Sequence, residues 1–184
     1  NTDQGGRVLQ SCGTGNTSAL TTSIAGLTAS TWTPLGETLY EVTRYFRGMS
    51  SYYNDGVSYS SPIQYRCQKT FVIVITDGYP TQDTDFPADD PADVANTSAS
   101  LVDWDGLAPV TTSDQYPNFP SGSDGFQPSG VNTTEGFSLY LDDIAKFAYD
   151  IDMRTGSNDN TGVSFDDLRY PKQNVVTYTV GFAV

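Results

Sequence analysis

Two continuous apolar runs stand out in an otherwise polar chain. Residues 70–75 (TFVIVI) and residues 174–182 (NVVTYTVGF) consist largely of β-branched and aromatic side chains. Strands of a parallel sheet that are covered on both faces have this pattern. We therefore predict strands at 70–75 and 174–182, and we expect the first to be buried on both faces. A shorter strand is predicted over residues 6–10.

Apolar residues recur at helical spacing in three further segments. The first predicted helix follows residues 16–18, and the second begins at Pro34, which suits the first position of a helix capped by Thr33. The second helix ends at Gly48, and the third opens at residues 134–135. The apolar stripes of these helices are Leu20, Ile24 and Leu27; Leu35, Leu39, Val42 and Phe46; and Phe137, Leu141, Ile144, Ala148 and Ile151, with Asp142, Asp143 and Lys146 outside the third.

Helix and buried strand alternate along the chain, which predicts an α/β fold with a largely parallel sheet. The 184 residues fit one domain, residues 1–184. Residues 79–133 interrupt the pattern, because they are rich in Pro, Asp, Gly and Ser and show no sustained periodicity. A connection this long is uncommon and is usually functional or disordered. We interpret 79–133 as a loop-rich acidic insertion within the domain.

The charge balance narrows the classes of function. The chain has 9 basic and 22 acidic residues, a net charge of −13 at pH 7, and no histidine. Without histidine there is no Ser-His-Asp or Cys-His catalysis and no His-bound zinc. An acidic chain does not attract nucleic acids or anionic membranes by charge, and no apolar run approaches the ~20 residues that span a bilayer. The missing histidine argues against a hydrolase, and we expect no nucleic-acid partner and no membrane span.

Two oxygen-bearing side chains lie where ligands bind in open α/β sheets, at the carboxyl ends of strands. Asp77 directly follows the first apolar run, and Thr33 stands at a predicted helix start. A hydroxyl, a carboxylate and water form a suitable partial shell for Mg²⁺ or Ca²⁺. The alternatives are that Thr33 only caps its helix and that Asp77 is an ordinary turn carboxylate.

A second candidate metal site is the acidic stretch at residues 83–93, which holds five carboxylates in eleven residues. Ca²⁺ takes six to eight oxygen ligands in flexible geometry and suits such a loop. The candidate ligands are Asp83, Asp85, Asp89 and Asp90. The alternative is a solvated acidic loop without a metal ion.

Cysteine and tyrosine supply the remaining candidates. Cys12 and Cys67 form no Cys-x-x-Cys motif, and an even count favours one disulfide in an oxidising compartment; the alternative is two free thiols. Tyr52, Tyr53 and Tyr59 lie in a Ser- and Tyr-rich loop and are candidates for a contact surface, because tyrosine is enriched at interfaces. The alternative for that loop is ordinary packing.

Several of these segments together resemble a known family. The stretches TPLGETL at 33–39 and FVIVITDG at 71–78 are similar to the second and third motifs of a von Willebrand factor A domain. More narrowly, SPIQYRCQK at 61–69, YLDDIAK at 140–146 and NVVTYTVGF at 174–182 resemble the PilY/PilC family, the large secreted proteins at the tips of bacterial type IV pili. The resemblance covers nearly all of the chain and is weakest over 79–133.

This resemblance implies a three-layer, Rossmann-like fold with a mostly parallel sheet between helices. It also implies a metal-ion-dependent adhesion site, in which Thr33 binds Mg²⁺ or Ca²⁺ directly and Asp77 binds it directly or through water. The expected role is non-enzymatic adhesion or surface sensing at the tip of an extracellular pilus. Its partners would be minor pilins and a host or abiotic surface ligand.

One departure from the family pattern matters. The Asp-x-Ser-x-Ser loop of such sites, with three further metal ligands, occurs nowhere in the sequence. We therefore expect an incomplete domain whose first strand comes from the remainder of the same protein or from another chain. The alternative function is a structural subunit of a pilus or another extracellular filament, with a vestigial metal site.

Overall fold

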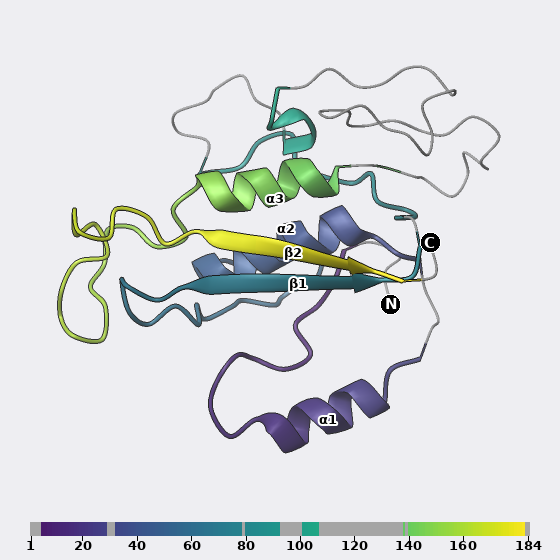
Figure 1. The fold of residues 1–184 in the computed structure, drawn as a ribbon, viewed down its shortest axis with the longest axis horizontal. Coiled ribbons are helices and arrows are strands. Elements are labelled where there is room, and N and C mark those ends of the chain that lie inside the picture. The colour runs from purple at the N-terminus through teal and green to yellow at the C-terminus, as the bar shows by residue number, and fades with distance from the viewer. Residues whose placement is uncertain are drawn as a thin grey trace.

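The computed structural model describes residues 5–28, 32–78, 80–92, 101–106, 138 and 140–182. These residues form an α/β arrangement, as the alternation of apolar patterns predicts (Figure 1). The elements in chain order are the helix α1 (Thr17–Ala25), the helix α2 (Leu35–Arg47), the strand β1 (Thr70–Thr76), the 3₁₀ helix η1 (Leu101–Asp103), the helix α3 (Leu141–Asp150) and the strand β2 (Val175–Gly181).

The strands β1 and β2 are neighbours in one parallel two-stranded sheet. The register pairs Thr70 with Val175 at one end and Thr76 with Gly181 at the other. The two strong strand predictions are thus confirmed. The predicted strand over 6–10 is wrong, because that segment is irregular. It lies against α2 instead, where the Gly5 N–H donates to the Glu37 carboxylate (2.6 Å).

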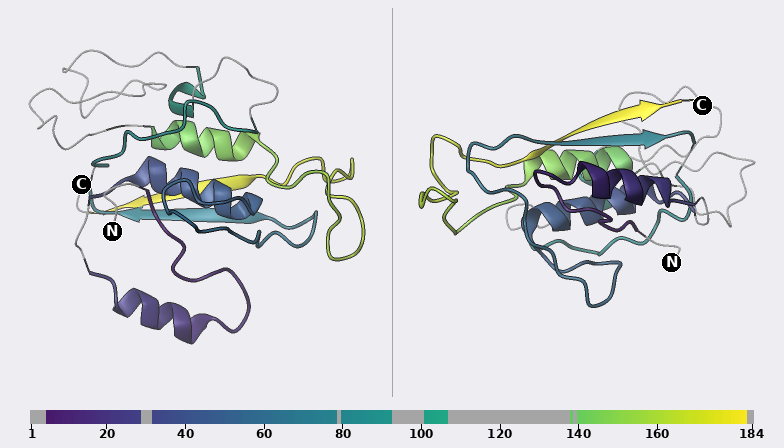
Figure 2. Two further views of the ribbon diagram at one scale, coloured as in Figure 1. Left: turned by 180° about the vertical axis from the view of Figure 1, so that it is seen from behind. Right: turned by 90° about the horizontal axis from the view of Figure 1, so that it is seen from below.

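The core lies between the sheet and the two helices α2 and α3. Tyr40 of α2 and Phe147 of α3 are both fully buried, and their ring centroids are 6.3 Å apart. Phe147 was not part of the predicted stripe of α3, although Ile144 and Ala148 beside it were, and both are buried. In Figure 2 (right), the two strands lie on one side of the molecule and α2 and α3 on the other.

The second face of the sheet is bare, which contradicts the expectation that β1 is buried on both faces. Side chains of Phe71, Ile73 and Ile75 are 55%, 62% and 63% exposed. Their register partners on β2 share this face because paired residues in a sheet point the same way. We call this surface the bare sheet face; it consists of Phe71, Ile73, Ile75, Val176, Tyr178 and Val180.

The boundaries of the helices agree only in part with the sequence pattern. Gly48 ends α2 as predicted, in the left-handed conformation (φ 70°) that favours glycine. The helix α3 begins at Leu141, and the expected start at 134–135 lies outside the described residues. Asp143, expected on the outer face, is buried and accepts a hydrogen bond from the Asp105 N–H (3.1 Å).

The helix α1 forms as its apolar spacing predicts, but it buries no residue. Its stripe of Leu20 and Ile24, with Leu27 just beyond it, is exposed to solvent. Figure 1 shows α1 standing apart from the sheet and from the other helices. The described residues therefore include two separate apolar surfaces that are exposed, the bare sheet face and the apolar side of α1.

Candidate functional site

The loop before α2 and the loop after β1 lie side by side at the carboxyl end of the sheet. The Thr33 N–H donates to the Thr81 hydroxyl (2.9 Å), and the Thr81 N–H donates back to the Thr33 carbonyl (3.0 Å). Thr81 follows Asp77 by four residues. At the same end, the Phe182 N–H donates to the Thr76 carbonyl (3.2 Å). The Thr33 loop therefore lies at the carboxyl end of the sheet, where Asp77 directly follows β1.

The donor types at this edge fit a hard cation, but their number falls short of a complete shell. Thr33 is half-buried and Asp77 is exposed. Neither the hydrogen bonds nor the ion pairs of the described residues engage the Asp77 carboxylate, so its oxygens are available. Mg²⁺ takes one or two protein carboxylates and several waters. No group of three or more acidic or cysteine side chains within the described ranges is arranged to hold a metal ion.

Asp83 caps α2, and this capping contact joins the start of the insertion to the helix. Its carboxylate accepts hydrogen bonds from the N–H groups of Gly36 (3.0 Å) and Glu37 (2.8 Å), and from the Ser138 hydroxyl (2.9 Å). The side-chain cap predicted from Thr33 is therefore wrong: no side-chain cap hydrogen bond comes from the residue at the helix start, and Thr33 contributes only its carbonyl, which accepts from the Leu35 N–H (3.0 Å). Asp83 is fully buried, and burial raises the pKa of its carboxyl.

Glu37 is a buried acidic residue that the sequence analysis did not single out. Its two carboxylate oxygens accept hydrogen bonds from the Gly5 N–H (2.6 Å) and the Asp85 N–H (2.8 Å). It thereby joins the N-terminal segment, α2 and the insertion. Burial raises the pKa of Glu37 to about 7, and the two hydrogen bonds offset only part of this increase. The neighbouring carboxylates of Asp83 and Asp85 raise it further.

Asp90 is buried as well and forms an ion pair with Arg47. The two guanidinium N–H groups of Arg47 reach separate oxygens of Asp90 at 2.6 and 2.8 Å, and Tyr40 donates to Asp90 at 2.7 Å. Burial alone would raise the pKa of Asp90, but the hydrogen bonds and charge of Arg47 bring it below its ordinary value. Two of the predicted calcium ligands therefore already have partners within the protein. Asp83 binds the first turn of α2, and Asp90 binds Arg47.

The other two predicted calcium ligands are placed differently. Asp89 is exposed, and Asp85 is half-buried with its backbone engaged. The Asp85 carbonyl accepts the Tyr53 hydroxyl (2.6 Å). The stretch that sequence reasoning treated as a calcium loop or a solvated loop is thus partly packed against α2. A calcium site there stays a prediction.

The three predicted contact tyrosines have distinct environments. Tyr53 belongs to the buried core, so its ring is covered. Tyr52 is exposed and packs edge-on against Tyr53, with ring centroids 4.9 Å apart. Tyr59 is half-buried and donates its hydroxyl to the Glu41 carboxylate (2.5 Å). Of the three, Tyr52 offers the most surface to a partner.

The two cysteines are free thiols in the structure, and both are exposed. The Cys12 N–H donates to the Tyr45 hydroxyl (2.8 Å), which holds the N-terminal segment against α2. Cys67 precedes β1 at the amino end of the sheet. The predicted disulfide is not formed here.

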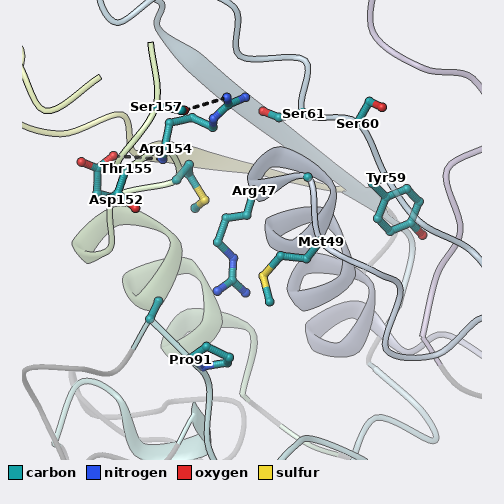
Figure 3. Close-up of a pocket in the computed structure, with 13 residues that line it drawn as sticks. Arg47, Met49, Tyr59, Ser60, Ser61, Pro91, Asp152, Arg154, Thr155 and Ser157 are labelled. Carbon is teal, nitrogen blue, oxygen red and sulfur yellow. Dashed lines mark hydrogen bonds between the residues drawn. The ribbon is translucent and has the colours of Figure 1, made fainter. Parts of the chain in front are cut away.

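A pocket of about 730 Å³ lies beyond the carboxyl end of α2, away from Thr33 and Asp77. Figure 3 shows Arg47 and Met49 facing it from the α2 side, with Arg154 at its opposite wall. Arg47 is neutralised by Asp90, and Arg154 donates to the Ile63 carbonyl (3.1 Å) and lies over the Phe165 ring. Both guanidinium groups already have partners within the protein. Their presence in the pocket is therefore accounted for without a ligand.

Comparison with known proteins gives no family assignment. No family model, curated protein or solved structure matches the chain. Among the described helices, none has the length and apolar character needed to cross a membrane. The residues of the site and the resemblance of the motifs at 33–39 and 71–78 to those of a von Willebrand factor A domain are the remaining indications of function.

Proposed function

We propose that the chain is a non-enzymatic adhesion or surface-sensing module of a type IV pilus tip protein. In this proposal the fold is part of a three-layer von Willebrand factor A domain, and the partner binds through a divalent cation at the carboxyl ends of the strands. Thr33 and Asp77 are the cation ligands that this chain contributes. Water and an acidic group of the partner complete the shell.

The observation that carries this proposal is the pair of hydrogen bonds between Thr33 and Thr81. These bonds hold the loop that contains Thr33 beside the loop that follows Asp77, although Thr33 and Thr81 are more than forty residues apart in sequence. Parallel strands that end at one edge and a helix that starts there are the arrangement in which α/β proteins bind ligands. The motif resemblance at 33–39 and 71–78 points to the same two residues.

The test is a calorimetric titration with Mg²⁺ and then Ca²⁺. The wild type is compared with Asp77→Ala and with Asp55→Ala, which removes an exposed carboxylate from a distant loop. Binding that is lost in Asp77→Ala and retained in Asp55→Ala supports the proposal. Binding that survives in Asp77→Ala refutes the assignment of Asp77 and directs attention to Asp85 and Asp89.

The bare sheet face favours a second candidate function, a structural subunit of an extracellular assembly. Contiguous apolar patches of this kind on soluble proteins usually mark contact sites. A subunit that buries this face needs no metal ion. Assembly measured with and without a chelator separates the two functions, since a structural subunit of this kind assembles equally well in the presence of a chelator.

A further inference from the structure

Basic residues are scarce in this chain, yet four of them line one small pocket. The chain has 9 lysines and arginines in total. Arg66, Lys69, Arg169 and Lys172 all border a pocket of about 300 Å³ at the amino end of the sheet. Among the described residues, no aspartate or glutamate lines it. In a protein with a net charge of −13, this pocket is a local region of opposite charge.

The two arginines and the two lysines differ in how they are neutralised. Arg66 pairs with Asp159 (2.7 Å) and Asp167 (3.0 Å), and Arg169 pairs with Asp167 (2.7 Å). Lys69 makes no ion pair among the described residues. The Lys172 ammonium donates to the Tyr149 carbonyl (3.3 Å), lies 5.8 Å from the centre of that ring, and interacts electrostatically with Asp150 without a direct ion pair. The four basic residues at the pocket thus outnumber the carboxylates around them, because Asp159 and Asp167 neutralise the two arginines and Asp150 is shared between Lys172 and Lys146.

The pocket is continuous with the bare sheet face. Phe71 and Val176 line the pocket and are also register partners at the amino end of that face. Beyond them, Ile73 with Tyr178 and Ile75 with Val180 extend the apolar surface toward the other end of the strands. A cationic pocket therefore opens onto an apolar surface nearly as long as the sheet.

We propose that this combined surface binds an acidic, apolar segment of a partner polypeptide. One or two carboxylates of the segment enter the pocket beside Lys69 and Lys172, and the apolar residues next to them cover the bare sheet face. The volume of about 300 Å³ is at the lower end for small-molecule sites and accommodates one or two carboxylate side chains. The overall negative charge opposes long polyanions such as nucleic acids. The pocket lies at the opposite end of the strands from Asp77, and its lysines are not among the proposed cation ligands, so the inference stands apart from the metal-dependent function.

The test uses fluorescence anisotropy with three labelled peptides on the full chain. The probe is Asp-Asp-Phe-Val-Ile-Val; Asn-Asn-Phe-Val-Ile-Val removes its charge, and Asp-Asp-Ser-Thr-Ser-Thr removes its apolar part. We expect the probe to bind more tightly than either control peptide and to weaken as salt is added, because exposed charges are screened. The double variant Lys69→Gln/Lys172→Gln is expected to weaken binding of the probe by roughly tenfold or more.

The control variant is Lys146→Gln/Arg44→Gln, which removes the same charge outside the pocket lining. Thermal melting of each variant establishes that the fold is intact. Equal loss of affinity in both double variants would overturn the proposal, as would equal binding of the Asn-Asn peptide. No binding of the probe at millimolar concentration would also overturn it. Tighter binding of a single-stranded oligonucleotide, with the same dependence on Lys69 and Lys172, would reassign the pocket to nucleic acid.

Discussion

Buried carboxylates organise this molecule at the scale of single residues. Glu37, Asp83 and Asp90 are each essentially inaccessible to solvent, and each accepts hydrogen bonds from a different part of the chain. Burying a charge is unfavourable unless it is paired or hydrogen-bonded. These contacts explain why an acidic insertion stays attached to a helix rather than being repelled into solvent.

Asp90→Asn should destabilise the protein strongly. The side chains of Arg47 and Asp90 are only 7% and 0% exposed, so the substitution leaves a buried guanidinium without its counter-charge. Loss of one partner of a buried pair costs about 3–5 kcal/mol. Urea denaturation measures the free energy of unfolding. The matched control is Asp150→Asn in the exposed pair with Lys146, where we expect less than about 1 kcal/mol.

Glu37 should make stability depend on pH near neutrality. Its pKa is about 7 in the folded protein, above its ordinary value of 4.5. A raised carboxyl pKa stabilises the fold at low pH, and this contribution is lost as the pH rises from about 4.5 through 7. The loss amounts to roughly 3 kcal/mol at about 1.4 kcal/mol per pKa unit.

Glu37→Gln is therefore expected to flatten the profile of unfolding free energy between pH 5 and 8, while Asp55→Asn leaves it unchanged. Asp83, whose pKa is also raised by burial, retains a smaller dependence of the same sign. A variant profile as steep as that of the wild type would show that Glu37 does not titrate in this range.

At the scale of elements, α2 depends on a cap supplied from far along the chain. Asp83 accepts hydrogen bonds from its first turn, although it lies 47 residues from Gly36. The space around Gly36 is correspondingly tight, since an added Cβ would lie 3.1 Å from the Asp83 carboxylate. The start of the insertion and the start of α2 therefore form one unit.

Asp83→Ala should destabilise this unit by about 1–2 kcal/mol, the usual effect of losing a helix cap. The reason is that two buried N–H groups lose their acceptor. Hydrogen exchange of the Gly36 and Glu37 amides reports the local effect, and both should exchange faster. Asp89→Ala, at an exposed position of the same segment, is the control and should change neither rate.

The elements also show how far sequence reasoning reaches. The β-branched runs predicted β1 and β2, and the spacing around Leu39 and Ile144 predicted α2 and α3, because these signals are local. The role of Asp83 was not predictable, since nothing in its own neighbourhood indicates a helix start elsewhere in the chain. For the same reason, Glu37 looked like an ordinary polar residue on a helix.

At the scale of the whole molecule, the uncovered side of the sheet is the feature that sequence reasoning misjudged. An apolar run such as 70–75 indicates that something covers each face, but it does not say whether the cover belongs to the same chain. Among the described elements, α2 and α3 cover one face of the sheet and none lies on the other. The loops of Thr33 and Asp77 meet at one end of the sheet, as the positions of the helix start and the strand end predicted. The metal site itself stays a prediction.

Ile73→Ser should reduce self-association of the protein with little change in its folding stability. Ile73 is 62% exposed, so we expect a change in unfolding free energy of less than about 1 kcal/mol. Self-association in sedimentation velocity experiments should decrease, because the bare sheet face becomes more polar. Ile63→Ser is the control in the core, where removal of a buried aliphatic side chain should cost about 2–5 kcal/mol. A large destabilisation by Ile73→Ser would mean that this face is covered in solution.

The parallel register of the two strands has a mechanical consequence. Seven residue pairs join β1 and β2, from Thr70 and Val175 to Thr76 and Gly181, with evenly spaced hydrogen bonds. A tension applied between the beginning of β1 and the end of β2 runs along both strands, so it loads the whole ladder at once in shear. Tension between the two adjacent strand beginnings opens the ladder pair by pair, like a zipper. The direction of pulling, rather than the number of bonds, thus determines the force at which this sheet yields.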